Sequence, residues 1–148
     1  GLDWDGIRRA YEKNKSAGST VAGGSTLTQQ LAKNLFLSRK KTYWRKAQEA
    51  FIALMMEQML TKERILTLYL NVAQWGHGIY GAEAAAQYFF HRSAQELTPE
   101  QAAELAIRLP SPTYYHDHGI SPRMIEYRTF IMTQMPLVKT PAINKEQL

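Results

Sequence analysis

Apolar residues recur every three or four positions along most of the chain, which is the period of a helix that buries one face. The clearest case follows Thr26, where a Thr-x-x-Gln capping box precedes Leu27 and Leu31 at helical spacing. No stretch combines strict alternation of apolar and polar residues with hairpin turn residues. The pattern therefore predicts a mostly α fold.

Other segments carry helix signals of the same kind. Thr61 and Thr98 stand at N-cap positions, Pro99 and Pro122 at first helical positions, and Pro136 at a stop. A stretch rich in small and flexible residues predicts a loop over 15–24. We expect helices over residues 4–15, 25–37, 42–59, 61–70 and 82–88, one that begins at 98, and a last one over 121–135.

The segment over residues 42–59 is the most apolar of these expected helices. Its run over 51–56 is apolar all round, which predicts a central, buried helix. We expect six of its residues to face inward: Ala47, Ala50, Phe51, Leu54, Met55 and Met59.

The length and composition are those of one globular domain. The chain has 148 residues, and we expect a single domain over 1–138 with a C-terminal tail over 139–148. The lack of cysteine excludes a disulfide framework and a thiol nucleophile. Eighteen Lys and Arg against 13 Asp and Glu give a net charge of +5, which favours an anionic partner.

Polar and basic residues are densest between Gly23 and Glu49. A Gly-Gly-Ser-Thr turn that enters a helix offers backbone amides and the positive end of the helix dipole to an anion. Lys41, Arg45 and Glu49 stand at i, i+4 and i+8, and Lys46 lies three positions before the same acid. One carboxylate is therefore expected to face several cations.

Such surroundings predict the role of Glu49. Nearby positive charge should lower the pKa of this carboxyl group and keep it ionised. An ionised group suits an electrostatic stabiliser, a hydrogen-bond acceptor or a metal ligand better than a neutral general acid. The alternative is an ordinary surface ion pair worth about 0.3–0.5 kcal/mol.

The remaining candidates are weaker. His116, Asp117 and His118 are closely spaced, but without an identified third ligand they are read as loop residues rather than a metal site. His77 and His91 are read as structural or solvated. No nucleic-acid recognition motif accompanies the basic charge, so we expect no nucleic-acid partner.

Four segments carry a family signature in a fixed order. Residues 23–34 read GGSTLTQQLAKN, 45–50 read RKAQEA, 62–71 read KERILTLYLN and 75–85 read WGHGIYGAEAA. This order resembles the peptidoglycan glycosyltransferases of family 51, found in class A penicillin-binding proteins and in monofunctional transglycosylases. A looser resemblance continues to Arg128.

The resemblance implies a lysozyme-like fold and an enzyme that polymerises lipid II into glycan strands at the outer face of the bacterial inner membrane. The growing strand is the donor, undecaprenyl pyrophosphate leaves, and a membrane anchor is expected upstream of residue 1. Moenomycin-like inhibitors are expected ligands, and a divalent cation, Mg or Mn, is a possible cofactor.

The resemblance also implies residue roles. Glu49 matches the second family glutamate, which assists the departing pyrophosphate directly or through a divalent cation. Lys41 stands where the family commonly has arginine, so it keeps the charge without the bidentate fork. Ten positions are expected to bind substrate: Ser25, Thr26, Gln29, Gln30, Lys33, Asn34, Lys41, Arg45, Lys46 and Arg128.

One departure from the family pattern concerns its first motif, whose glutamate is the general base. Only the end of that motif is found, at residues 1–4, so the base would lie just upstream. We therefore expect the 148 residues alone to be inactive or nearly so, since loss of a positioned base typically costs about 10²–10⁴-fold. Two alternatives stay open: a lysozyme-like lytic glycosidase, and a non-catalytic module that binds lipid pyrophosphates or membranes.

Overall fold

The computed structural model describes residues 5, 8, 12, 25–37 and 43–139. The loop expected over 15–24, Lys41, most of the helix expected over 4–15 and nearly all of the tail lie outside these residues. The described chain is mostly helical, which confirms the predicted fold class. Its contacts gather into two compact units, residues 1–66 and 67–148.

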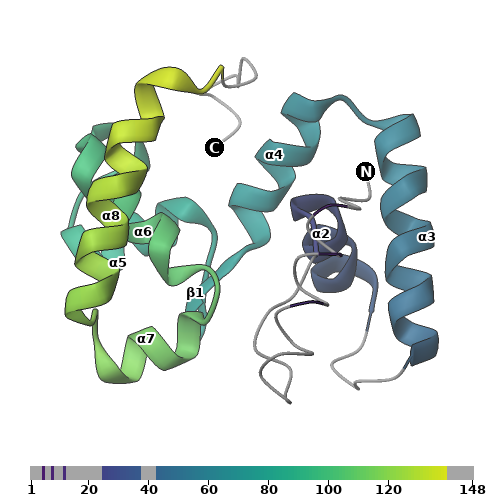
Figure 1. The fold of residues 1–148 in the computed structure, drawn as a ribbon, viewed down its shortest axis with the longest axis horizontal. Helices are drawn as coiled ribbons and strands as arrows, with labels where there is room; N and C mark the ends of the chain where they lie inside the picture. The colour runs from purple at the N-terminus through teal and green to yellow at the C-terminus, as the bar shows by residue number, and fades with distance from the viewer. Residues whose placement is uncertain (1–4, 6–7, 9–11, 13–24, 38–42, 140–148) are drawn as a thin grey trace. The chain divides into compact units, whose positions relative to one another are not determined.

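In the first unit, α2 (Leu27–Phe36) packs against α3 (Tyr43–Met59), and α4 (Lys62–Val72) begins after a short turn (Figure 1). The expected capping box is present: the Thr26 hydroxyl accepts from the Gln29 backbone N–H at 3.3 Å, and the Gln29 side-chain oxygen accepts from the Thr26 N–H at 3.1 Å. Thr61 caps α4 as expected, through a 3.3 Å hydrogen bond from the Arg64 N–H. Local sequence thus sets the start of both helices.

The inward face expected for α3 is wrong. Its buried residues are Glu49, Ala53 and Met56, at the i, i+4 and i+7 positions of one stripe. A run that is apolar all round does not say which side is buried, and here the side with the carboxylate faces α2. Ala50 is half-buried, and the remaining residues expected inside are exposed: Ala47, Phe51, Leu54, Met55 and Met59.

The second unit contains the end of α4 and a short antiparallel pair, β1 (Gln74–Gly76) and β2 (Ile79–Tyr80), which the sequence pattern does not predict. Four helices follow, with α6 packed on α8 and α7 on β1: α5 (Ala82–Phe90), α6 (Pro99–Arg108), α7 (Pro112–His118) and α8 (Pro122–Gln134). The 3-10 turns are η1 (Ala94–Glu96) and η2 (Met135–Leu137), so Pro136 lies inside a final turn.

The core of this unit is built around β1 and α6. Trp75 is buried, and its indole N–H donates to the Leu105 carbonyl at 2.9 Å. Gly81 joins β2 to α5 with φ +87°, and a Cβ there would lie 2.9 Å from the Asn71 carbonyl oxygen. A side chain at this position would be both strained and too close, which explains the glycine.

Glu83 joins α5 to η1. Its carboxylate accepts from the Ala94 N–H at 2.7 Å and from the Gln87 amide at 3.1 Å. Both hydrogen bonds lower the pKa of Glu83 below its ordinary value of 4.5, and the bond from the Ala94 N–H has the larger effect. The stabilisation is therefore present above pH 4.5 and lost as pH falls through the lower pKa of the folded state.

We expect the Glu83→Gln variant to have a lower Tm than the wild type at neutral pH. At a pH far below the pKa of Glu83, the two proteins should have the same Tm. Thermal unfolding followed by circular dichroism across this pH range measures the difference. A Tm gap that does not narrow on acidification would contradict the assignment.

Candidate functional site

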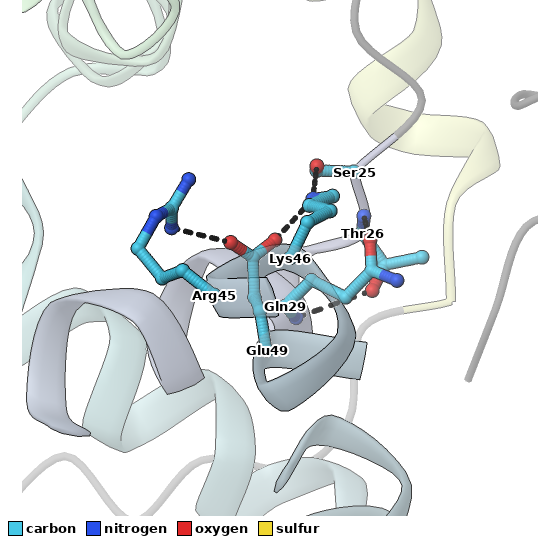
Figure 2. A network of polar contacts seen from close by, with 6 residues as sticks. All are labelled: Ser25, Thr26, Gln29, Arg45, Lys46 and Glu49. Atoms are coloured by element: carbon cyan, nitrogen blue, oxygen red, sulfur yellow. Dashed lines mark hydrogen bonds and ion pairs between the residues drawn. The ribbon is translucent and has the colours of Figure 1, made fainter. Parts of the chain in front are cut away.

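The candidate site is built around Glu49, whose side chain is only 3% exposed. One carboxylate oxygen accepts from the Arg45 guanidinium at 3.0 Å, and the other accepts from the Lys46 ammonium group (Figure 2). Both partners come from the preceding turn of α3, as the sequence spacing predicts. Two cations therefore face one carboxylate, and the cluster has an excess of one positive charge.

Lys46 also connects α3 to the start of α2. Its ammonium group donates to the Ser25 hydroxyl at 2.6 Å, 21 positions earlier in the sequence. Figure 2 shows Ser25, Lys46 and Glu49 in a continuous line of contacts. The amino-terminal end of α2, where the helix dipole is positive, thus lies beside Lys46.

Thr26 and Gln29 act differently from Ser25. The Gln29 side chain is buried and its oxygen accepts from Thr26, so both residues fix the first turn of α2. Ser25, just before the N-cap, reaches across to Lys46 of α3. The sequence motif therefore combines a helix cap with a contact to the cationic pair.

The cluster has the chemistry of an anion site. The Lys46 side chain is 49% exposed, so its ammonium group can reach a ligand in solution. The Arg45 side chain is 16% exposed, and its guanidinium is fixed by the ion pair with Glu49. Cationic donors beside a helix amino terminus are a common arrangement for binding phosphate groups. Twelve of the 18 Lys and Arg residues but only six of the 13 Asp and Glu residues belong to the sequence of the first unit, residues 1–66.

The other expected substrate-binding residues lie elsewhere. Lys33 and Asn34 are exposed on the second half of α2, and Gln30 is half-buried. Lys41 lies outside the described residues. Arg128 belongs to α8 in the second unit, where its guanidinium pairs at 3.0 Å with both Glu100 and Glu104 of α6.

Glu104 is shared by two arginines. It also pairs at 3.0 Å with Arg108, whose guanidinium lies 4.2 Å from the centre of the Phe89 ring. The Arg128 contacts therefore tie α8 to α6 within the second unit. Any ligand of Arg128 would have to share its guanidinium with two carboxylates.

The described residues do not fit a protein-built site for a divalent cation. Glu49 is the only acid in its cluster, and both of its oxygens already accept from cations. No group of three His, Asp or Glu side chains gathers at metal-binding distances within the part of the chain that the structure describes. No chemical step is therefore assigned to a metal.

His116, Asp117 and His118 are helical rather than loop residues, because Pro112 starts the short helix α7. Asp117 pairs with His77 of the β1–β2 turn at 3.1 Å, and this hydrogen bond lowers the pKa of Asp117 below its ordinary value. His91 ends α5 in the left-handed conformation, with φ +53°. His77 and Asp117 thus join the β1–β2 turn to α7, and His91 caps the end of α5.

Sequence reasoning missed a second acid that faces α2. Glu57 stands eight positions after Glu49 on α3, and one of its oxygens accepts from the Thr28 hydroxyl at 2.6 Å. Two features of the sequence could have indicated this contact. Glu57 directly follows the apolar run over 51–56, and Thr28 lies in the first turn of the neighbouring helix.

Comparison with known proteins identifies transglycosylases, both by family model and by individual relatives. The family model described as Transglycosylase matches residues 1–136. Three similar proteins bear the name biosynthetic peptidoglycan transglycosylase, each aligned over 141 residues or 95% of this chain. The relative from Alcanivorax borkumensis is 60% identical, and those from Chromobacterium violaceum and Methylobacillus flagellatus are 51% identical. The chain spans 58% of the length of the first relative and 62% of the other two.

Proposed function

Because the chain belongs to the transglycosylase family, we propose that the protein polymerises peptidoglycan glycan strands from lipid II. The buried Glu49 carboxylate between Arg45 and Lys46 is the observation that carries this proposal. The donor is the growing glycan strand, and its undecaprenyl pyrophosphate is the leaving group. In this proposal Arg45 and Lys46 bind that pyrophosphate.

The reaction breaks the bond between the donor sugar and a pyrophosphate oxygen. The 4-hydroxyl of the next lipid II forms the new glycosidic bond and gives its proton to a general base outside this cluster. Negative charge grows on the pyrophosphate as it leaves, and Lys46 and Arg45 stabilise that charge. Glu49 holds both cations in position, which suits a carboxylate whose two oxygens accept hydrogen bonds.

Further donor contacts are proposed from the family motifs. Ser25 holds Lys46 beside the start of α2, and Thr26 and Gln29 fix the first turn of that helix, whose positive dipole end favours the same anion. The remaining proposed contacts are Gln30, Lys33, Asn34, Lys41 and Arg128.

The proposed location follows from the substrate. A lipid-linked donor places the reaction at the outer face of the inner membrane, where moenomycin-like inhibitors would compete for the same pyrophosphate subsite. Among the described helices, none has both the length and the apolar composition needed to cross a bilayer.

The lytic alternative requires a different state of Glu49. A glycosidase general acid must hold a proton that it gives to the leaving oxygen. Both oxygens of Glu49 accept hydrogen bonds from Arg45 and Lys46, and neither is placed as a donor. The geometry therefore supports polymerisation over lysis.

One experiment separates the three candidate functions. The full-length gene product is incubated with lipid II and, separately, with purified peptidoglycan. We expect glycan polymer and released undecaprenyl pyrophosphate from lipid II, and no soluble sugar fragments from peptidoglycan. Released fragments would establish the lytic function instead. Binding of lipid II without either product would leave a binding module.

A further inference from the structure

Glu57 is a second carboxylate of α3 that lies toward α2 and that the proposed reaction does not use. Its side chain is 17% exposed, and one oxygen accepts from the Thr28 hydroxyl at 2.6 Å. Thr28 is itself buried, with 5% of its surface exposed. The other oxygen lies 3.7 Å from the Lys62 ammonium group at the start of α4. Glu57 thus joins three helices of the first unit.

The Thr28 contact complements the contact made by Ser25. Ser25 and Thr28 are three residues apart at the start of α2, and they reach Lys46 and Glu57 of α3. The packing of α2 on α3, with Leu31 and Ala32 fully buried, already limits how the helix can turn. Two polar contacts on different turns of α3 further restrain the position and the rotation of the first turn of α2.

We propose that Glu57 is a positioning residue, which holds the first turn of α2 against α3 so that Ser25 keeps Lys46 on the departing pyrophosphate. This inference rests on the proposed function, because it concerns the same phosphate site. Glu57 touches no substrate in this account. It acts through Thr28, the first turn of α2 and Ser25.

The arrangement of charges agrees with such a role. Arg45 and Lys46 pair with Glu49, whereas Glu57 pairs with Lys62 and Thr28. The acid therefore does not neutralise either cation of the phosphate site. Glu57 should therefore affect anion affinity by fixing the position of the first turn of α2. Replacing Glu57 with a neutral residue should weaken anion binding, although a negative charge has been removed.

The test is calorimetric titration of the full-length protein with inorganic pyrophosphate. We expect Glu57→Gln and Thr28→Val each to weaken affinity about 3- to 10-fold, and the double variant to be no weaker than the worse single variant. Thr28→Ser keeps the hydroxyl and should restore wild-type affinity. Glu126→Gln, which removes an exposed carboxylate of the second unit, is the matched control and should bind at least as well as the wild type.

Thermal unfolding of each variant distinguishes a positioning role from a merely structural one. A lower Tm with unchanged pyrophosphate affinity for both Glu57→Gln and Thr28→Val would overturn the inference. Lys46→Ala is titrated alongside. If Lys46→Ala weakens binding but the Thr28 and Glu57 variants do not, only the positioning role fails. If Lys46→Ala also binds normally, the phosphate site itself fails, and the positioning role with it.

Discussion

Glu49→Gln is expected to reduce lipid II polymerisation by about 10²–10³-fold, the loss typical of removing one preorganised electrostatic group from an active site. The amide has nearly the shape of the carboxylate, but it no longer holds two cations by charge. Arg45 and Lys46 then lose the fixed placement that Glu49 gives them through both of its oxygens. Small errors in placement matter most in the transition state, where the leaving group gains charge.

The same substitution should not weaken binding of free pyrophosphate. Glu49 contacts both cations, so removing its negative charge raises the positive potential directly at Arg45 and Lys46. This gain should offset the lost placement of the two cations, so affinity should stay equal or increase. Glu57 pairs with Thr28 and Lys62 instead, and its replacement brings no such gain. Polymerisation is measured with the full-length protein and lipid II, and binding is measured by titration with pyrophosphate. Glu126→Gln controls for the loss of an acid elsewhere and should leave turnover intact. Wild-type turnover by Glu49→Gln would remove this residue from the mechanism.

Lys46→Ala is expected to weaken pyrophosphate binding about 10- to 100-fold. Hydrogen bonds that involve a charged group contribute about 1.5–3 kcal/mol each, and Lys46 is the exposed cation of the pair. The substitution also removes the link between Ser25 and Glu49.

Arg64→Ala provides the control for net charge, because it removes an exposed cation of the same unit that lies outside the cluster. A small, salt-sensitive effect is expected for it. Equal losses for Lys46→Ala and Arg64→Ala would mean that the unit attracts anions through its overall charge, without a defined site.

Helix starts could be predicted because their signals are local. The caps at Thr26, Thr61 and Thr98 each depend on residues within one turn, and all three helices begin where expected. Helix α7 begins at Pro112 after the N-cap Ser111, with the same Ser-Pro signal that begins α8, so this local signal also marks its start.

The buried face of α3 could not be predicted in the same way. Six consecutive apolar residues fit any rotation of the helix, and the choice depends on what the neighbouring helix presents. Here Glu49 faces α2, and Lys46 of α3 joins Glu49 to Ser25, just before the start of α2. The polar contact, rather than the apolar run, marks the side that is buried.

In the candidate site, contacts within one helix could be predicted from the sequence, but contacts between helices could not. Spacing along one helix brings Arg45, Lys46 and Glu49 together, and the structure confirms both ion pairs. The contacts of Ser25 with Lys46 and of Thr28 with Glu57 join positions 21 and 29 residues apart. No helical period relates such positions, because they depend on how α2 packs against α3.

The most direct test of the phosphate site is a paired pyrophosphate titration of Glu49→Gln and Lys46→Ala against the wild type. The two residues touch each other, yet we expect different results from their variants. Glu49→Gln should bind pyrophosphate at least as tightly as the wild type, and Lys46→Ala should bind it at least tenfold more weakly. Wild-type affinity in Lys46→Ala, or a tenfold loss in Glu49→Gln, would contradict the assignment of this cluster to the departing pyrophosphate.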